Sequence, residues 1–187
     1  MSTPLEVNLI RRIAMGDTLR RRAASHGQSE ALVEFIDGER IAIDFNTLNA
    51  RVNQVVRGLR DKGIKQGDRI AILGANTSQM LTALLSCFKG AFVAVPVNYV
   101  QNPSDVEYNI EHSGAVAVFA DENLHPLVAQ ATANIDREFL LVNLSGKASE
   151  AFLDFEALLD GQTSAEIEDI IIEDDDVAQI MYTSGTT

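Results

Sequence analysis

The sequence has little cysteine, few basic residues and no long apolar run, and each shortage excludes a class of protein. The single cysteine, Cys87, cannot form an internal disulfide, which excludes a disulfide scaffold and favours a reducing compartment. No apolar stretch reaches the roughly 18–20 residues that span a bilayer, and the N-terminus has no apolar run of signal-peptide length. We therefore expect a cytoplasmic protein without a membrane span.

Basic residues are outnumbered, with 15 Lys and Arg against 27 Asp and Glu, for a net charge of −12. This balance argues against a nucleic-acid partner, because phosphate backbones are bound by basic surfaces. Glycine and proline are also few, and hydrophobic residues make up 46% of the chain, which excludes a disordered or collagen-like protein. A chain of 187 residues suits one globular domain or slightly more.

The first third of the chain predicts a helix, a β-hairpin and a second helix. Residues 17–27 predict a short helix capped by Asp17 or Thr18. Its arginines are expected on a solvated face, since the apolar face is thin; they are Arg20, Arg21 and Arg22. Residues 31–45 predict a hairpin that turns at Asp37-Gly38, and residues 46–63 predict an amphipathic helix. The residues available to cap and end that helix are Asn46, Thr47 and Gly63.

Between residues 69 and 142, short apolar strands alternate with helices. The expected strands are residues 69–74, 91–97, 115–120 and 138–142. The expected helices are residues 76–90, 102–114 and 123–134. In the first of these helices the residues expected to face inward are Met80, Leu81, Leu84, Leu85 and Phe88. The alternation predicts an α/β fold with a mostly parallel sheet covered by helices on both faces.

After residue 142 the alternation weakens. Residues 143–164 predict one short helix, and residues 165–176 form an acid-rich connector. Its acids could bind a divalent metal, but they are contiguous rather than spaced as in a calcium loop, which favours a solvated connector. These acids are Glu166, Glu168, Asp169, Glu173, Asp174, Asp175 and Asp176.

The last eleven residues combine an apolar run, Val177–Tyr182, with a run of small residues. The small residues are Thr183, Ser184, Gly185, Thr186 and Thr187. Backbone N–H groups of a glycine-containing turn, together with hydroxyls, form a donor cluster suited to phosphate oxygens. The run lacks the second glycine and the Lys-Ser/Thr pair of a Walker P-loop. Alone, it is equally consistent with a frayed polar tail.

Other residues that could carry chemistry do not form a recognisable site. Cys87 lies in an apolar run and is expected to be a core residue. The histidines, His26, His112 and His125, have no metal-ligand spacing. Neither a Gly-x-Ser-x-Gly elbow nor a dinucleotide-binding glycine motif occurs. We therefore predict no catalytic residue and no metal ligand in this chain.

Four stretches in this order resemble the adenylate-forming (AMP-binding) superfamily of acyl-CoA synthetases, luciferases and peptide-synthetase adenylation domains. They are residues 43–80, residues 84–98 with the sequence LLSCFKGAFVAVPVN, residues 103–121, and DVAQIMYTSGTT at residues 176–187. The last resembles the start of the family's phosphate loop, Tyr-Thr-Ser-Gly-Thr-Thr-Gly-x-Pro-Lys. Two departures, Phe45-Asn46 and the glycine position in Lys89-Gly90-Ala91-Phe92, are expected to be packing changes. The resemblance covers residues 17 to 187.

The resemblance implies an enzyme that activates a small-molecule carboxylic acid with ATP and Mg²⁺ as an acyl-adenylate, then transfers the acyl group to CoA. It implies that residues 183–187 bind the ATP phosphates. It also implies that the chain is the N-terminal part of an AMP-binding domain and is inactive alone, since it lacks the loop's following glycine and lysine. The expected layout is an arm at 1–16, an α/β core at 17–142, a connector at 143–176, and a strand and loop start at 177–187.

Three alternatives stay open at this point. Asn98 favours a CoA ligase over the amino-acid-activating branch, which more often has Asp there, but transfer to a carrier protein is not excluded. The chain could also be a non-catalytic α/β binding or assembly module. Finally, a chain without the rest of the domain could form a homodimer through the uncovered surface.

Overall fold

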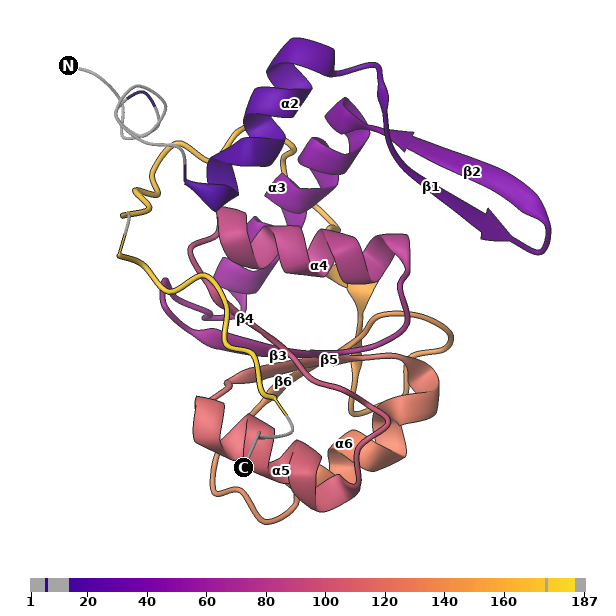
Figure 1. Ribbon diagram of the computed structural model, residues 1–187, viewed down its shortest axis with the longest axis vertical. Coiled ribbons are helices and arrows are strands. Elements are labelled where there is room, and N and C mark those ends of the chain that lie inside the picture. The colour runs from indigo at the N-terminus through magenta and orange to yellow at the C-terminus, as the bar shows by residue number, and fades with distance from the viewer. Residues whose placement is uncertain (1–5, 7–13, 174, 184–187) are drawn as a thin grey trace.

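The structure, a computed structural model, describes residue 6 and residues 14–173 and 175–183. A five-stranded parallel sheet lies between two layers of helices, and a two-stranded antiparallel sheet projects from one end (Figure 1). The helices are α2 (Thr18–His26), α3 (Phe45–Asp61), α4 (Ser78–Lys89), α5 (Pro103–Ser113) and α6 (His125–Thr132), with single turns η1 (Met15–Asp17), η2 (Glu122–Leu124) and η3 (Phe155–Leu158). The strands are β1 (Glu30–Ile36), β2 (Glu39–Asp44), β3 (Arg69–Leu73), β4 (Val93–Pro96), β5 (Ala117–Ala120), β6 (Leu140–Asn143) and β7 (Leu153–Asp154). The predicted α/β class is confirmed.

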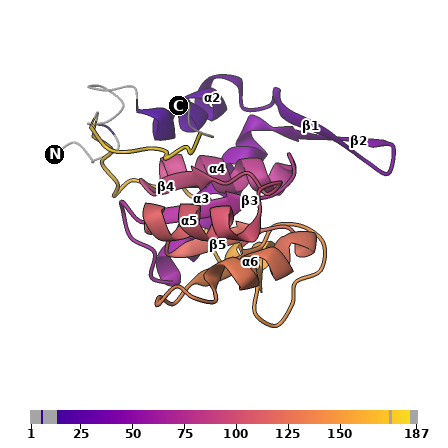
Figure 2. The ribbon, with the colours of Figure 1, turned by 60° about the horizontal axis from the view of Figure 1, so that its bottom comes forward.

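The strand order of the parallel sheet is β4-β3-β5-β6-β7, and residue alternation within each strand feeds two separate cores. In β3, Ile70 and Ile72 join the core under α3 and α4, whereas Ala71 and Leu73 join the core under α5 and α6. Such double burial explains why the central strands read as continuous apolar runs. The two helical layers lie on opposite sides of the sheet in both views (Figures 1 and 2).

The predicted hairpin forms and extends away from the body as an arm (Figure 1). Its turn uses Asp37 and Gly38, whose φ angles of 52° and 84° suit the two-residue turns that match strand twist. The arm carries large exposed apolar side chains, with Phe35 70% exposed.

Helix α4 buries a different face from the one its apolar residues predict. The fully buried residues are Thr82, Ala83, Ser86, Cys87 and Lys89. Of the residues expected inward, Met80, Leu84, Leu85 and Phe88 are half-buried and pack against the edge of the core. The buried hydroxyls of Thr82 and Ser86 each donate to the carbonyl four residues earlier, at 2.7 Å, so their burial leaves no orphaned donor.

The helix caps follow the prediction in part. Asn102 caps α5 and accepts from the N–H of Asp105. Helix α3 begins earlier than expected, because Asp44 accepts from the N–H of Thr47 at 2.7 Å and Asn46 and Thr47 already lie within the helix. Asp17 stands at the start of α2 without a capping hydrogen bond, since its carboxylate faces Arg20 instead.

The acid-rich connector keeps most of its described acids exposed, as predicted for a solvated connector, and its backbone is held against α3. Side chains on α3 donate to its backbone carbonyls: Asn53 to Ser164 at 2.9 Å and Arg57 to Ala165 at 2.6 Å. Arg60 forms a two-bond ion pair with Asp169, at 3.0 and 2.6 Å. The connector therefore follows a fixed path across α3 although it has no regular secondary structure.

A buried ionic cluster joins this connector to the helices. The Lys89 side chain is 1% exposed; it binds the carboxylate of Glu166 and donates to Asn49 at 2.7 Å. Arg20 is 6% exposed and lies 3.1 Å from Asp17 and 3.6 Å from Glu166. The expectation that Arg20 lies on a solvated face is therefore wrong, because two carboxylates neutralise its charge in the interior.

Candidate phosphate-binding site

The segment before the predicted phosphate loop adds to the open edge of the sheet beside β4. Ala94 donates to Ala178 at 3.0 Å and accepts from Ile180 at 2.9 Å, which makes a parallel bridge with Gln179. The predicted strand over Val177–Tyr182 is thus reduced to this single bridge. Since a parallel partner ends at the same edge as β4, the segment delivers exposed Thr183 to the carboxyl edge of the sheet. The other four predicted phosphate-binding residues, Ser184, Gly185, Thr186 and Thr187, lie outside the described residues.

The carboxyl edge between β3 and β5, where the strand order reverses, is filled by the protein itself. Asp121 follows β5, is buried, and accepts from the N–H of Ala75 at 2.7 Å and the hydroxyl of Ser145 at 2.6 Å. A Cβ at Gly74 would come within 3.1 Å of this carboxylate. Open α/β sheets usually bind ligands at this reversal point. Here Asp121 occupies it, which leaves the segment beside β4 as the candidate site.

Tyr182, the residue before Thr183, is anchored to α5. Its hydroxyl lies 2.9 Å from Nδ1 of His112, and its ring meets the ring of Tyr108 edge-on, with centroids 6.0 Å apart. Tyr108 stacks on His112 in turn. Partial burial raises the pKa of the Tyr182 phenol above its ordinary value. Sequence reasoning missed His112 because it looked for metal-ligand spacing; the only signal was the pair Tyr108 and His112, four residues apart on one helix face.

The remaining candidate side chains pack within the fold and do not form a reactive site. Cys87 is buried, and burial raises the pKa of its thiol to about 12, which confirms a core residue rather than a nucleophile. His125 stacks on Phe152 with ring centroids 3.6 Å apart. Within the described ranges no group of three or more His, Cys, Asp or Glu could hold a metal ion. The described residues therefore do not fit a Mg²⁺ site.

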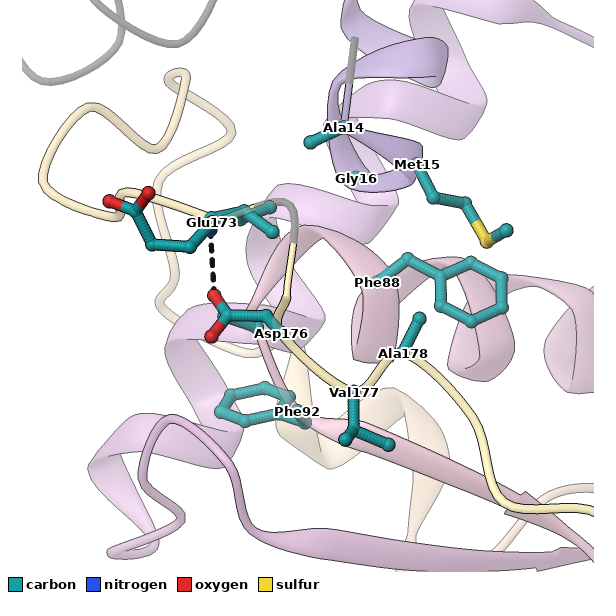
Figure 3. Close-up of a pocket in the computed structure, with 11 residues that line it drawn as sticks. Ala14, Met15, Gly16, Phe88, Phe92, Glu173, Asp176, Val177 and Ala178 are labelled. Carbon is teal, nitrogen blue, oxygen red and sulfur yellow. Dashed lines mark hydrogen bonds between the residues drawn. The ribbon is translucent and has the colours of Figure 1, made fainter. Parts of the chain in front are cut away.

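A cavity of about 210 Å³ lies near the opposite end of the last segment, away from Thr183. Figure 3 shows Phe88, Phe92 and Val177 around it, with Glu173 and Asp176 joined by a hydrogen bond at one side. The 2.8 Å bond from the Glu173 N–H to Asp176 closes the turn that leads into the β4-pairing segment. The carboxylate of Asp176 is thus used within the chain, and the cavity is separate from the candidate site.

An open parallel sheet with a run of hydroxyl and glycine residues following in sequence after a segment that pairs with its edge is typical of α/β domains that bind phosphates. The family model described as AMP-binding enzyme matches residues 19–187. The chain therefore belongs to the AMP-binding enzyme family, as its sequence motifs indicate. None of the helices in the described part of the chain is both long and apolar enough to cross a membrane.

Known proteins similar to this chain include CoA ligases and a carrier-protein ligase. The 3-hydroxybenzoate/4-hydroxybenzoate–CoA ligase of Thauera aromatica is 31% identical over 147 residues, which cover 78% of this chain and 28% of that enzyme. A fatty acid–[acyl-carrier-protein] ligase of Streptomyces coeruleorubidus is 28% identical over 170 residues, 91% of this chain and 31% of that protein. The crystal structure of an anthranilate CoA ligase in complex with anthranoyl-AMP matches with a TM-score of 0.80 and 20% identity, covering 92% and 32% of the two chains. This chain thus spans about a third of its relatives' length.

Proposed function

We propose that this chain is the N-terminal subdomain of an ATP-dependent ligase that activates a carboxylic acid as its acyl-adenylate and passes the acyl group to CoA. The observation that carries the proposal is the parallel pairing of Ala178–Ile180 with β4, which places Thr183 at the carboxyl edge of the sheet. In the proposal, Thr183, Ser184, Gly185, Thr186 and Thr187 donate hydrogen bonds to the ATP phosphates. Donors at this position offset the negative charge that develops as pyrophosphate leaves.

The 187-residue chain alone is proposed to be inactive. The relatives that act on acids are about three times longer than this chain, and the described residues contain no metal-binding cluster. The acid is a small molecule; hydroxybenzoate, anthranilate and fatty acid are the candidates because the similar ligases act on these classes.

The test compares the 187-residue chain with a protein that also contains whatever its gene encodes after Thr187. Each is given ATP, Mg²⁺ and CoA with hydroxybenzoate, anthranilate or a long-chain fatty acid, and AMP and acyl-CoA are measured. We expect acid-dependent formation of AMP and thioester by the longer protein only. In that protein, Thr183→Val should lose activity, whereas Thr163→Val should keep it. AMP release by the 187-residue chain would refute its inactivity, and no AMP from the longer protein would refute the ligase.

A second candidate acceptor is the phosphopantetheine thiol of a carrier protein. The Streptomyces coeruleorubidus relative supports it, since that protein joins a fatty acid to an acyl carrier protein. Replacing CoA by a phosphopantetheinylated carrier protein in the same assay separates the two acceptors. Acyl transfer to the carrier protein in the absence of CoA would favour this second acceptor.

A further inference from the structure

Between the sheet and the predicted phosphate loop, the last segment has few fixed points in the described residues. The β4 bridge at Gln179 is the last backbone pairing, and Met181 is 71% exposed. Ile180 and Tyr182 alternate with Gln179 and Met181, so their side chains turn toward the core under α5, against which both pack. Without a further contact, the direction of the chain at Thr183 would depend on one bridge.

That further contact is the aromatic group on α5. The Tyr182 hydroxyl lies 2.9 Å from His112 Nδ1, and the Tyr182 ring is 5.8 Å from the His112 ring at 76°. The ring of Tyr108 stacks on the ring of His112, with the ring centroids 5.1 Å apart and an interplanar angle of 21°. Two rings, those of His112 and Tyr108, therefore hold Tyr182 by one directional bond and two ring contacts.

We propose that His112 and Tyr108 are positioning residues for ATP binding: they fix Tyr182 and so set where the phosphate-binding segment leaves the sheet. The inference rests on the proposed function and deepens it. His112 and Tyr108 touch neither ATP nor acid; they act through Tyr182, which is joined to Thr183 by one peptide bond. Fixing this point before ATP arrives lowers the ordering cost that binding would otherwise meet.

The first arm of the test asks whether the contact exists, using the 187-residue chain at one fixed pH. The variant Tyr182→Phe removes only the hydroxyl, and Tyr99→Phe removes the hydroxyl of an exposed tyrosine elsewhere as a control. We expect NMR signals of the His112 ring and the Thr183 amide to shift in Tyr182→Phe and to stay in place in Tyr99→Phe. Unchanged His112 signals in Tyr182→Phe would overturn the inference.

The second arm measures its consequence in the longer protein. We expect the KM for MgATP to rise roughly three- to tenfold in Tyr182→Phe and in His112→Phe, the loss of one neutral hydrogen bond, with kcat changed less than about twofold. The double variant should be no worse than either single one, because both remove the same bond. A KM equal to that of Tyr99→Phe would overturn the positioning role.

The two arms separate this inference from the proposed function. If the longer protein forms no AMP with any acid, the ligase proposal fails, and the positioning role for ATP fails with it even where the NMR contact is present. If AMP forms but the KM for MgATP is unaffected by either variant, the ligase stands and only the positioning role is refuted.

Discussion

Lys89 illustrates how one residue can decide the path of a long segment. Its ammonium group ends α4 inside the molecule and meets Glu166, which belongs to the connector. Burial lowers the pKa of Lys89 to about 8, although Glu166 opposes this shift. For Lys89, desolvation therefore outweighs the attraction to its partner, whereas Lys89 and Asn49 hold the pKa of Glu166 below its ordinary value in spite of burial.

Removing the hydrogen-bonding end of the Lys89 side chain should destabilise the fold. In Lys89→Met, Glu166, whose side chain is only 25% exposed, and Asn49 both lose the donor that the Lys89 ammonium group supplies. We expect the free energy of unfolding to fall by about 2–4 kcal/mol in urea denaturation. Lys62→Met, at an exposed lysine, is the matched control and should change it by less than about 0.5 kcal/mol. Equal effects would show that Lys89 is not held by a buried pair.

The same lysine predicts a pH dependence. With a folded pKa of about 8 and an ordinary value of 10.5, Lys89 releases its proton in the folded state before the unfolded chain does. The unfolded state binds more protons in this window, so stability rises between about pH 8 and 10.5. The stability difference between wild type and Lys89→Met should widen by about 3 kcal/mol over this range. A constant difference would contradict the lowered pKa.

At the scale of elements, the alternation of strands and helices could be predicted because each signal is local. The strand β3 and helix α5 each carry their periodicity or caps in adjacent residues. The buried face of α4 could not be predicted from the sequence, because small residues are preferred on that face only as a result of the close packing of α3 against it. Nor could the connector path, since Arg57 and Ala165 are 108 residues apart in the sequence. The run proposed to bind phosphate was predicted from its composition, whereas the contact between Tyr182 and His112 depends on tertiary structure.

The contact between α3 and η3 predicts that a glycine-to-alanine substitution in α3 lowers the free energy of unfolding, which is the opposite of the usual effect in a helix. In an exposed helix, replacing glycine by alanine stabilises by about 1 kcal/mol. At Gly58, an added Cβ would lie 2.1 Å from the backbone carbonyl oxygen of Leu158. We expect Gly58→Ala to lower the free energy of unfolding by about 1–3 kcal/mol, because η3 must move with its buried side chains. Stabilisation in a denaturant titration would mean that the two elements are not in such close contact.

At the scale of the whole molecule, the described part of the chain exposes two apolar surfaces that bear on assembly. One is the hairpin arm with Phe35, and the other is the sheet edge beside β4, where Val177 is 60% and Met181 71% exposed. The bridge uses the groups of Ala178 and Ile180, so the N–H and C=O of Gln179 point away from β4. Such an edge is a template for pairing with another strand.

We therefore predict that the 187-residue chain associates through this edge into a homodimer. Sedimentation velocity should show a dimer fraction that increases with protein concentration. Pairing of two edges would bury Met181 and supply hydrogen-bond partners for the backbone N–H and C=O of Gln179. A lysine at the edge opposes such pairing. Met181→Lys should weaken association by about tenfold or more, an effect of the size of one buried apolar side chain. Val100→Lys is the matched control, since Val100 is equally apolar and exposed but lies outside the edge. If Met181→Lys still dimerises and Phe35→Lys does not, the arm is the interface; a monomer at all concentrations would exclude both surfaces.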